Sequence, residues 1–161
     1  MAFNHFDKQG RAHMVDVSGK PFTERKARAE AVVHLTPELV DMVLDQELAK
    51  GNVLAVARLA AIVAVKKTSD LIPLSHPLAI HHASLNFHHD REAGTITAEC
   101  EVIAVEKTGV EMEAMTGATV AALTVYDMCK GMDKGISIGP VQLLYKSGGK
   151  SGVYQREAAS E

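Results

Sequence analysis

The first regular pattern in the chain is an alternation of apolar and polar residues over positions 22–35. Every second residue from Ala27 to Val33 is apolar, and charged side chains stand between them as far as Glu30. Because successive strand residues point to opposite faces of a sheet, this alternation predicts a strand with one solvated face.

Two further segments, 80–89 and 95–105, alternate in the same way on either side of turn residues 90–94. This arrangement predicts an antiparallel hairpin. Residues 136–146 also have the character of a strand, and a glycine-rich segment over 147–152 follows them.

Helical patterns fill the gaps between the strands. Thr36 and Pro37 are suited to the N-cap and the first helical position, and they predict a helix that runs to about Lys50. Over residues 53–69 the apolar side chains cover most of the helical circumference, which predicts a helix buried in a core or in a subunit interface. A third helix is predicted over residues 113–129.

Two prolines interrupt the chain after the second predicted helix. Pro73 and Pro77 lie four residues apart in Asp-Leu-Ile-Pro-Leu-Ser-His-Pro, residues 70–77. Proline removes a helical hydrogen bond and restricts the residue before it, so this segment is predicted to be a defined, extended loop.

The order strand, helix, helix, hairpin, helix, strand is typical of an α+β fold, without a repeated βαβ unit or a dinucleotide-binding glycine motif. A ferredoxin-like sandwich, an antiparallel sheet with helices packed on one face, is the predicted architecture. We expect residues 1–161 to form a single domain, with 1–13 as a mobile N-terminal arm and 153–161 as a flexible tail.

Composition excludes several classes of function. Aromatic residues make up 4% of the chain, tryptophan is absent and the formal net charge is −3, so neither stacking on single-stranded nucleic acid nor binding of a phosphate backbone is expected. The longest apolar stretch, Val53 to Val65, is too short for a membrane span and contains Arg58. Two cysteines and no visible signal peptide predict a cytoplasmic protein.

Asp127 and Lys130 are three residues apart on the third predicted helix, so their side chains can meet. The simple interpretation is a surface ion pair. The alternative is a pair that divides the donor and acceptor roles of general acid/base catalysis, which the neighbouring Tyr126, Met128 and Cys129 favour if they bury this end of the helix.

Glu111 and Glu113 are two residues apart, so on a helix they point in directions about 200° apart and share no site. In an extended segment they would lie on the same side. They are either a pair in a strand or loop that leads into the helix, or two solvated acids favoured by the helix dipole.

His76 stands between Ser75 and Pro77 in the stiffened loop, which predicts an imidazole held in one direction, although a lone histidine is more often structural. The pairs His81-His82 and His88-His89 do not predict a metal site. Adjacent strand residues face opposite ways, and residues six apart are about 20 Å apart. We therefore predict no metal site.

The segment from Lys146 to Gly152 combines two cations, two hydroxyl groups and three glycines, a composition that can surround phosphate with backbone amides. It is not a P-loop, because Leu144 occupies the position of the first glycine. A flexible tail is the alternative. Arg25, Arg28 and Lys50 are candidates to complete an anion pocket, although such single charges are usually solvated.

Several longer segments together carry a family resemblance. They are His13-Met14-Val15-Asp16-Val17-Ser18, Ala27-Arg28-Ala29-Glu30-Ala31, Asp70-Leu71-Ile72-Pro73-Leu74-Ser75-His76-Pro77-Leu78, Lys107-Thr108-Gly109-Val110-Glu111-Met112-Glu113-Ala114, Tyr126-Asp127-Met128-Cys129-Lys130, and Gly139-Pro140-Val141 through Lys146-Ser147-Gly148-Gly149-Lys150-Ser151-Gly152. In their order and spacing these segments resemble the cyclic pyranopterin monophosphate synthase family of molybdenum cofactor biosynthesis. Ser75 is a departure, since relatives often carry cysteine there.

The resemblance implies a lyase that converts 3′,8-cyclo-7,8-dihydroguanosine 5′-triphosphate to cyclic pyranopterin monophosphate and releases pyrophosphate. It also implies a substrate supplied by a radical S-adenosylmethionine enzyme, and a homohexamer, a trimer of dimers, with active sites at the dimer interface. No cofactor is predicted, apart from magnesium as a possible companion of the triphosphate.

Site residues follow from the resemblance by position. It implies that Asp127 is the catalytic acid/base and that Lys130 is its partner. The implied substrate-binding residues are Leu74, Ser75, His76, Met112 and Glu113, with Lys50, Glu111 and Lys146 as further pocket residues. The rival hypotheses are a non-catalytic nucleotide-binding or regulatory module, and a purely structural oligomerisation domain.

Overall fold

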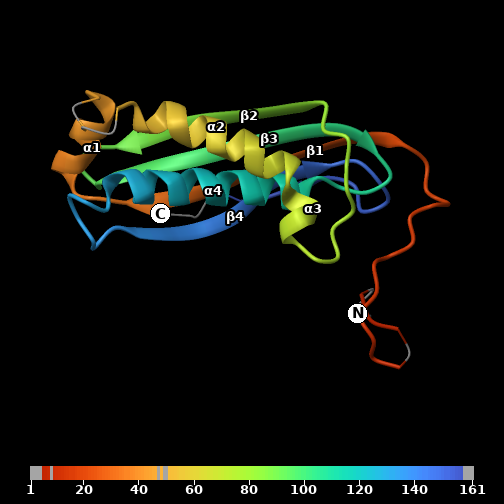
Figure 1. The fold of residues 1–161 in the computed structure, drawn as a ribbon. Helices are drawn as coiled ribbons and strands as arrows, with labels where there is room; N and C mark the ends of the chain where they lie inside the picture. The colour runs from red at the N-terminus through yellow and green to blue at the C-terminus, as the bar shows by residue number, and fades with distance from the viewer. Residues whose placement is uncertain (1–4, 8, 47, 49–50, 158–161) are drawn as a thin grey trace.

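The computed structural model describes residues 5–7, 9–46, 48 and 51–157, which form a single sheet with helices on one face (Figure 1). The strands lie in the order β2-β3-β1-β4-β5, and each neighbouring pair is antiparallel. Their bounds are β1 (Thr23–His34), β2 (His82–Asp90), β3 (Thr95–Glu106), β4 (Ser137–Ser147) and β5 (Tyr154–Gln155). The predicted ferredoxin-like α+β sandwich is confirmed.

The helices are α1 (Pro37–Leu44), α2 (Val53–Lys66), α3 (Thr68–Leu71) and α4 (Glu111–Cys129). Helices α2 and α4 lie side by side across the sheet, with α4 over β1, β3 and β4 (Figure 1). None of the helices in the described part of the chain is long and apolar enough to cross a membrane.

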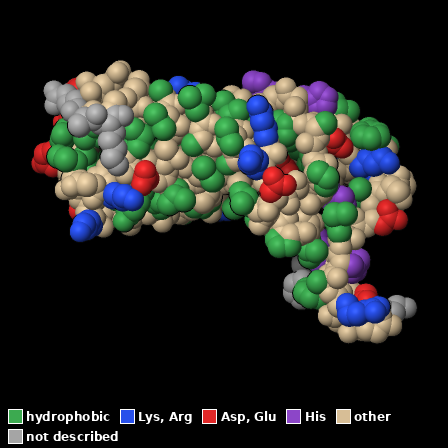
Figure 2. Space-filling model, in the orientation of Figure 1, with side chains coloured by type: hydrophobic (Ala, Val, Ile, Leu, Met, Phe, Trp, Pro, Cys, Tyr) green, Lys and Arg blue, Asp and Glu red, His purple; other side chains and the backbone are tan. Residues whose placement is uncertain are grey.

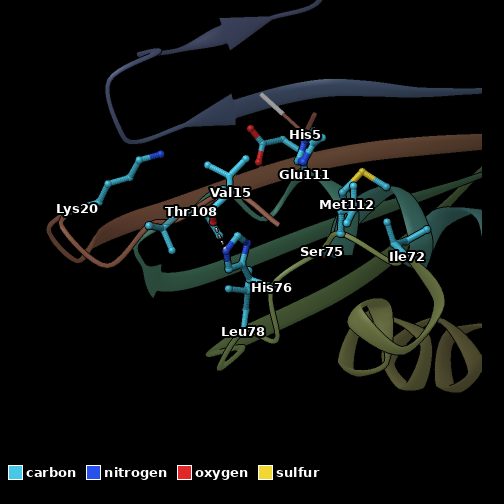
Figure 3. Close-up of a pocket in the computed structure, with 13 residues that line it drawn as sticks. His5, Val15, Lys20, Ile72, Ser75, His76, Leu78, Thr108, Glu111 and Met112 are labelled. Carbon is cyan, nitrogen blue, oxygen red and sulfur yellow. Dashed lines mark hydrogen bonds between the residues drawn. The ribbon is translucent and has the colours of Figure 1, made fainter. Parts of the chain in front are cut away.

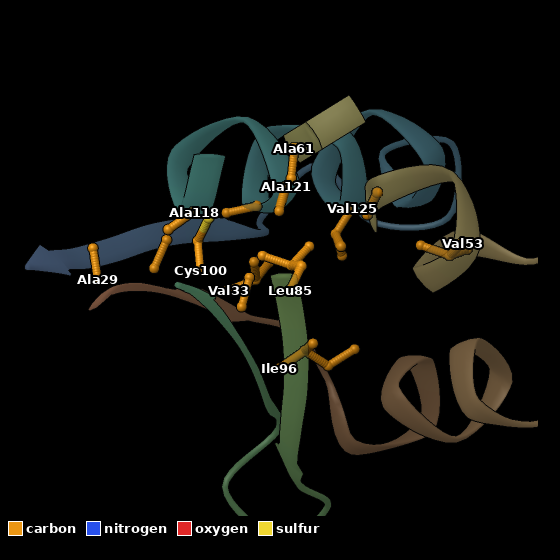
Figure 4. Close-up of a cluster of buried hydrophobic side chains, with 14 of the residues drawn as sticks. Ala29, Val33, Val53, Ala61, Leu85, Ile96, Cys100, Ala118, Ala121 and Val125 are labelled. Atoms are coloured by element: carbon orange, nitrogen blue, oxygen red, sulfur yellow. The ribbon is translucent and has the colours of Figure 1, made fainter. Parts of the chain in front are cut away.

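Small residues allow α4 to pack closely on the sheet. Along β1 the residues from Arg25 to Val33 are buried at every second position, as the alternation predicted, and three of them are alanine. The same pattern runs along β3, and the inward side chains meet those of α2 and α4 in one core (Figure 4). At Gly117 of α4 a β-carbon would lie 2.6 Å from Cys100 Sγ and 2.8 Å from Val65 Cγ2.

Several boundaries differ from those predicted, among them the end of α2 at Lys66 instead of residue 69 and the start of α4 at Glu111 instead of Glu113. The first helix ends at Leu44 and not near Lys50, because the backbone turns at Gln46, which has φ 60°, and Leu48 is buried in the core. The loop predicted to begin at Asp70 begins two residues later, because α3 includes Asp70 and Leu71. The hairpin and the first strand are confirmed.

The N-terminal part of the chain extends away from the body of the molecule (Figure 1). Asp7 and Arg11 close a small turn there, since Arg11 Nε donates to Asp7 Oδ2 at 2.7 Å. Residues 13–20, which we call the strap, then run without helix or strand structure to the start of β1. Only the sequence supports a mobile arm, which stays a prediction.

Candidate active site

A cavity of about 470 Å³ opens at the N-terminal end of α4, between the proline-containing loop and the strap (Figure 3). Five of the residues predicted to bind substrate line it: Leu74, Ser75, His76, Glu111 and Met112. The strap contributes Val15, Val17 and Lys20 to the opposite wall. The structure thus brings together two segments that are about 60 residues apart in the sequence.

The ring of His76 is held in one orientation by a hydrogen bond. Its Nε2 lies 2.8 Å from the carbonyl oxygen of Val15 (Figure 3). A carbonyl oxygen can only accept a hydrogen bond, so Nε2 carries the hydrogen and donates it. In the neutral ring Nδ1 is then the acceptor, which suits a group that takes a proton.

A second cavity, of about 690 Å³, adjoins the first. Four residues border both cavities: Lys20, Thr108, Gly109 and Glu111. The second cavity is lined by four cationic side chains, those of Lys20, Arg25, Lys107 and Lys150, and by a single carboxylate. Such an excess of cations suits a ligand with several negative charges.

The glycine-rich segment forms one wall of this second cavity. Gly148 and Gly149 have φ angles of 97° and 72°, a conformation that side chains other than glycine rarely adopt. A β-carbon on Gly149 would collide with the guanidinium group of Arg25. That group is itself buried and donates to the carbonyl oxygens of Glu106 and Lys107 at 3.1 and 3.2 Å, so it holds the end of β3 beside the glycines.

Lys146 lies near the same wall, although it does not border either cavity. It pairs in the sheet with Ala27, whose side chain faces the helices, so Lys146 belongs to the helix-covered face. Its Nζ donates to Ser151 Oγ, which ties the last full strand to the glycine-rich segment.

Glu113 is the buried acid of the site region. Its residue is 2% exposed, and burial raises the pKa of its carboxyl group to about 7, with a smaller contribution from the charge of Glu111. Both residues belong to α4, so the extended segment considered for them is wrong. Glu111 borders the cavities while Glu113 points into the protein, and the two carboxylates do not share one face.

Asp127 and Lys130 lie at the opposite end of α4. Lys130 Nζ is 2.7 Å from Asp127 Oδ1, and 52% and 62% of the two side chains are exposed. The hydrogen bond and the charge of Asp127 hold the pKa of Lys130 above its usual value. Neither residue borders the two cavities described above, and along the helix axis Asp127 is about 21 Å from Glu113.

Some residues of the cavities carried no clear signal in the sequence. Lys20 is a single lysine beside a proline, and Val15 and Val17 stood in a segment of family resemblance without a role of their own. Lys107 stood in a segment of family resemblance without a role of its own. Lys50, by contrast, was predicted to bind substrate and lies outside the described residues.

A metal site needs several histidine, cysteine, aspartate or glutamate side chains close together. Within the described residues, no three of them come close enough together to hold a metal ion. On the edge strand β2, the adjacent residues His88 and His89 point to opposite faces of the sheet.

Fold and cavities together define a class of protein: a single-sheet α+β protein with two adjoining cavities, one of them lined by four cationic side chains. The sequence pattern of the MoaC family matches residues 14–149, and the chain belongs to this family. That match covers the whole of α4 and the lining of both cavities apart from His5, Lys150 and Ser151.

Curated relatives match over almost the full chain. A protein from Geotalea uraniireducens named cyclic pyranopterin monophosphate synthase is 67% identical over 157 residues, which is 98% of each chain. Proteins of the same name are 62% identical in Geobacter sulfurreducens, again over 98% of each chain, and 50% identical in Listeria monocytogenes serotype 4a, over 96% of each chain.

Proposed function

We propose that this protein is a cyclic pyranopterin monophosphate synthase, a lyase that acts on 3′,8-cyclo-7,8-dihydroguanosine 5′-triphosphate and releases pyrophosphate. The observation that carries this proposal is the cation-lined cavity that adjoins the pocket around His76 and Met112. Its four cations suit a triphosphate, while the adjoining pocket has room for a purine-derived ring system. The relatives that carry this name match both halves of the site.

The residue types fit the chemistry. Opening the imidazole ring of a guanine and closing a pyrazine ring require repeated proton transfers, for which Asp127, Lys130, Glu113 and His76 are the proposed groups. In the phosphate step, a hydroxyl oxygen of the substrate bonds to the α-phosphorus. The bond between the α-phosphorus and the oxygen that bridges to the β-phosphorus breaks, and pyrophosphate leaves. The hydroxyl proton passes to a base, and Lys146 or Lys150 stabilises the charge on the departing pyrophosphate.

The site is proposed to be shared between subunits of a homohexamer built as a trimer of dimers. One end of α4 borders the cavities and the other carries Asp127 and Lys130, so a second chain is needed to unite them. An apolar face favours such assembly (Figure 2). Val56, Leu59 and Val63 of α2 are 44%, 67% and 52% exposed, which is typical of a surface that another chain covers.

The cellular location of the protein and the source of its substrate complete the proposal. A cytoplasmic location is supported by two buried cysteines, Cys100 and Cys129, which fit a reducing compartment. A radical S-adenosylmethionine enzyme is the proposed source of the cyclic nucleotide.

The direct test is to incubate the purified protein with the cyclic nucleotide and measure pyrophosphate and the cyclic monophosphate product together. The proposal expects equal amounts of both. Binding of the nucleotide without any release of pyrophosphate would instead support the rival, a regulatory nucleotide-binding module.

A further inference from the structure

The strap borders the site without being part of the sheet. Val15 and Val17 are half-buried against the first cavity, while the residues between and beside them are exposed. Within the described residues, no backbone hydrogen bond links residues 14–20 to a strand. Its position over the site therefore depends on side chains that reach it from the body of the protein.

Two such side chains are present. His76 donates to the carbonyl oxygen of Val15, as described above. Lys107, at the end of β3, donates from Nζ to the carbonyl oxygen of Ser18 at 2.7 Å, and the same ammonium group stands 5.2 Å from the centre of the Phe22 ring. Lys107 thus contacts the chain on both sides of Lys20.

The turn that Lys107 holds determines where Lys20 lies. The backbone N–H of Lys20 donates to the carbonyl oxygen of Val17 at 3.0 Å, which closes the turn, and the Lys20 side chain borders both cavities. Arg25 and Lys107 already donate to backbone carbonyl groups. Lys20 forms no ion pair with a described carboxylate, so its ammonium group is available to an anion.

We propose that Lys107 is a positioning residue, which fixes the strap at Ser18 so that Lys20 binds the phosphate groups of the substrate where the two cavities meet. This inference rests on the proposed function for the identity of the substrate. The ligand chemistry it requires is a chain of phosphate groups, which an ammonium group binds through charge-assisted hydrogen bonds.

A simpler role for Lys107 is that of a direct phosphate ligand, since it also borders the second cavity. The two roles predict different behaviour of the strap in the unliganded protein. Loss of a positioning residue releases the strap in the unliganded protein, whereas loss of a direct ligand leaves the strap in place.

The experiment compares Lys20→Met and Lys107→Met with Lys134→Met, an exposed lysine outside both cavities, as the matched control. Calorimetry with inorganic tripolyphosphate measures anion binding without turnover. Both site variants should weaken binding by a factor on the order of 10 or more, while the control binds as the wild type does. Unchanged binding by Lys20→Met, or no binding by the wild type, would overturn the inference.

Methyl NMR of Val15 and Val17 in the unliganded protein separates the two roles. We expect Lys107→Met to shift and narrow these signals as the strap becomes mobile, while Lys20→Met leaves them in place and Lys107→Arg restores them. Wild-type signals in Lys107→Met would refute the positioning role. Because neither measurement needs product formation, failure of the proposed reaction would be seen separately, in the assay for pyrophosphate.

Discussion

Glu113 carries a carboxyl group into the interior of the protein in the first turn of α4. Burial raises its pKa to about 7 from a usual value of 4.5, so at neutral pH the group is close to half-protonated. A general acid/base works best when its pKa is near the working pH. Glu113, which the family resemblance implied to be a substrate-binding residue, therefore has the near-neutral pKa expected of a proton-transfer group.

The raised pKa has a consequence for stability. Between pH 4.5 and about 7 the native state holds more protons at Glu113 than the unfolded state, so its contribution to the free energy of unfolding falls as the pH rises. We predict that Glu113→Gln raises the free energy of unfolding by about 1–3 kcal/mol at pH 8 and leaves it nearly unchanged at pH 4.5.

Urea unfolding of both proteins at several pH values and one protein concentration measures this difference. Glu38→Gln is the control, because Glu38 is also an acid in the first turn of a helix but is exposed. If the free energies of unfolding of the wild type and Glu113→Gln differed by the same amount across the pH range, the raised pKa of the Glu113 carboxyl group would be contradicted.

Asp127, unlike Glu113, has an exposed side chain. Its ion pair with Lys130 is more than half exposed, and exposed pairs contribute little to stability. We predict that Asp127→Asn changes the melting temperature by less than about 2 °C, keeps the affinity for the cyclic nucleotide and abolishes pyrophosphate release. Normal turnover of this variant would remove Asp127 from the mechanism.

At the scale of elements, the close contact between α4 and the sheet depends on Gly117. Alanine usually stabilises a helix interior by about 1 kcal/mol relative to glycine. Here the added methyl group would meet the side chains of Cys100 and Val65 at 2.6 and 2.8 Å, so overpacking should exceed that gain. We predict that Gly117→Ala lowers the free energy of unfolding by about 1–2 kcal/mol.

Gly131→Ala is the control for this comparison, since a β-carbon at Gly131 meets no atom within 4 Å. Urea unfolding of the two variants gives the difference directly. Equal stabilities would mean that α4 can move away from the sheet at little cost.

The sequence predicted strands better than helix ends, and for a physical reason. Alternation along β1 and β3 reports burial directly, and both strands were predicted correctly. The end of α1 depends on where the backbone must turn for Leu48 to reach the core, which is a tertiary requirement. The two acids at the start of α4 were ambiguous for the same reason, because spacing alone does not distinguish a helix from an extended segment.

The site was predictable only in part. His76 and Met112 stood in recognisable segments, and the structure places both at the first cavity. Lys20 could not be found in this way, since its role depends on a strap that crosses from the N-terminus to the end of β3. Contacts between such distant segments are set by the fold and leave no periodic signal.

At the scale of the whole molecule, the separation of the two ends of α4 has to be reconciled with a single reaction. His76 borders the cavities at one end, and Asp127 lies at the other. Apolar side chains of α2 and α4, among them Val56, Leu59, Val63 and Val120, line a shallow hollow on the surface. A site completed by a neighbouring subunit would unite His76 and Asp127. Under this proposal the apolar face would be covered by a neighbouring subunit, and assembly would be a condition of activity.

Subunit complementation tests this arrangement. His76→Ala and Asp127→Asn should each be inactive alone, since every site of either homo-oligomer lacks one group. When the two variants are co-expressed in equal amounts and assemble at random, about a quarter of the sites receive an intact His76 from one chain and an intact Asp127 from another. We therefore predict recovery of about 25% of the wild-type rate of pyrophosphate release. If both groups acted within one chain, no mixed assembly could contain an intact site, and the mixture would stay inactive.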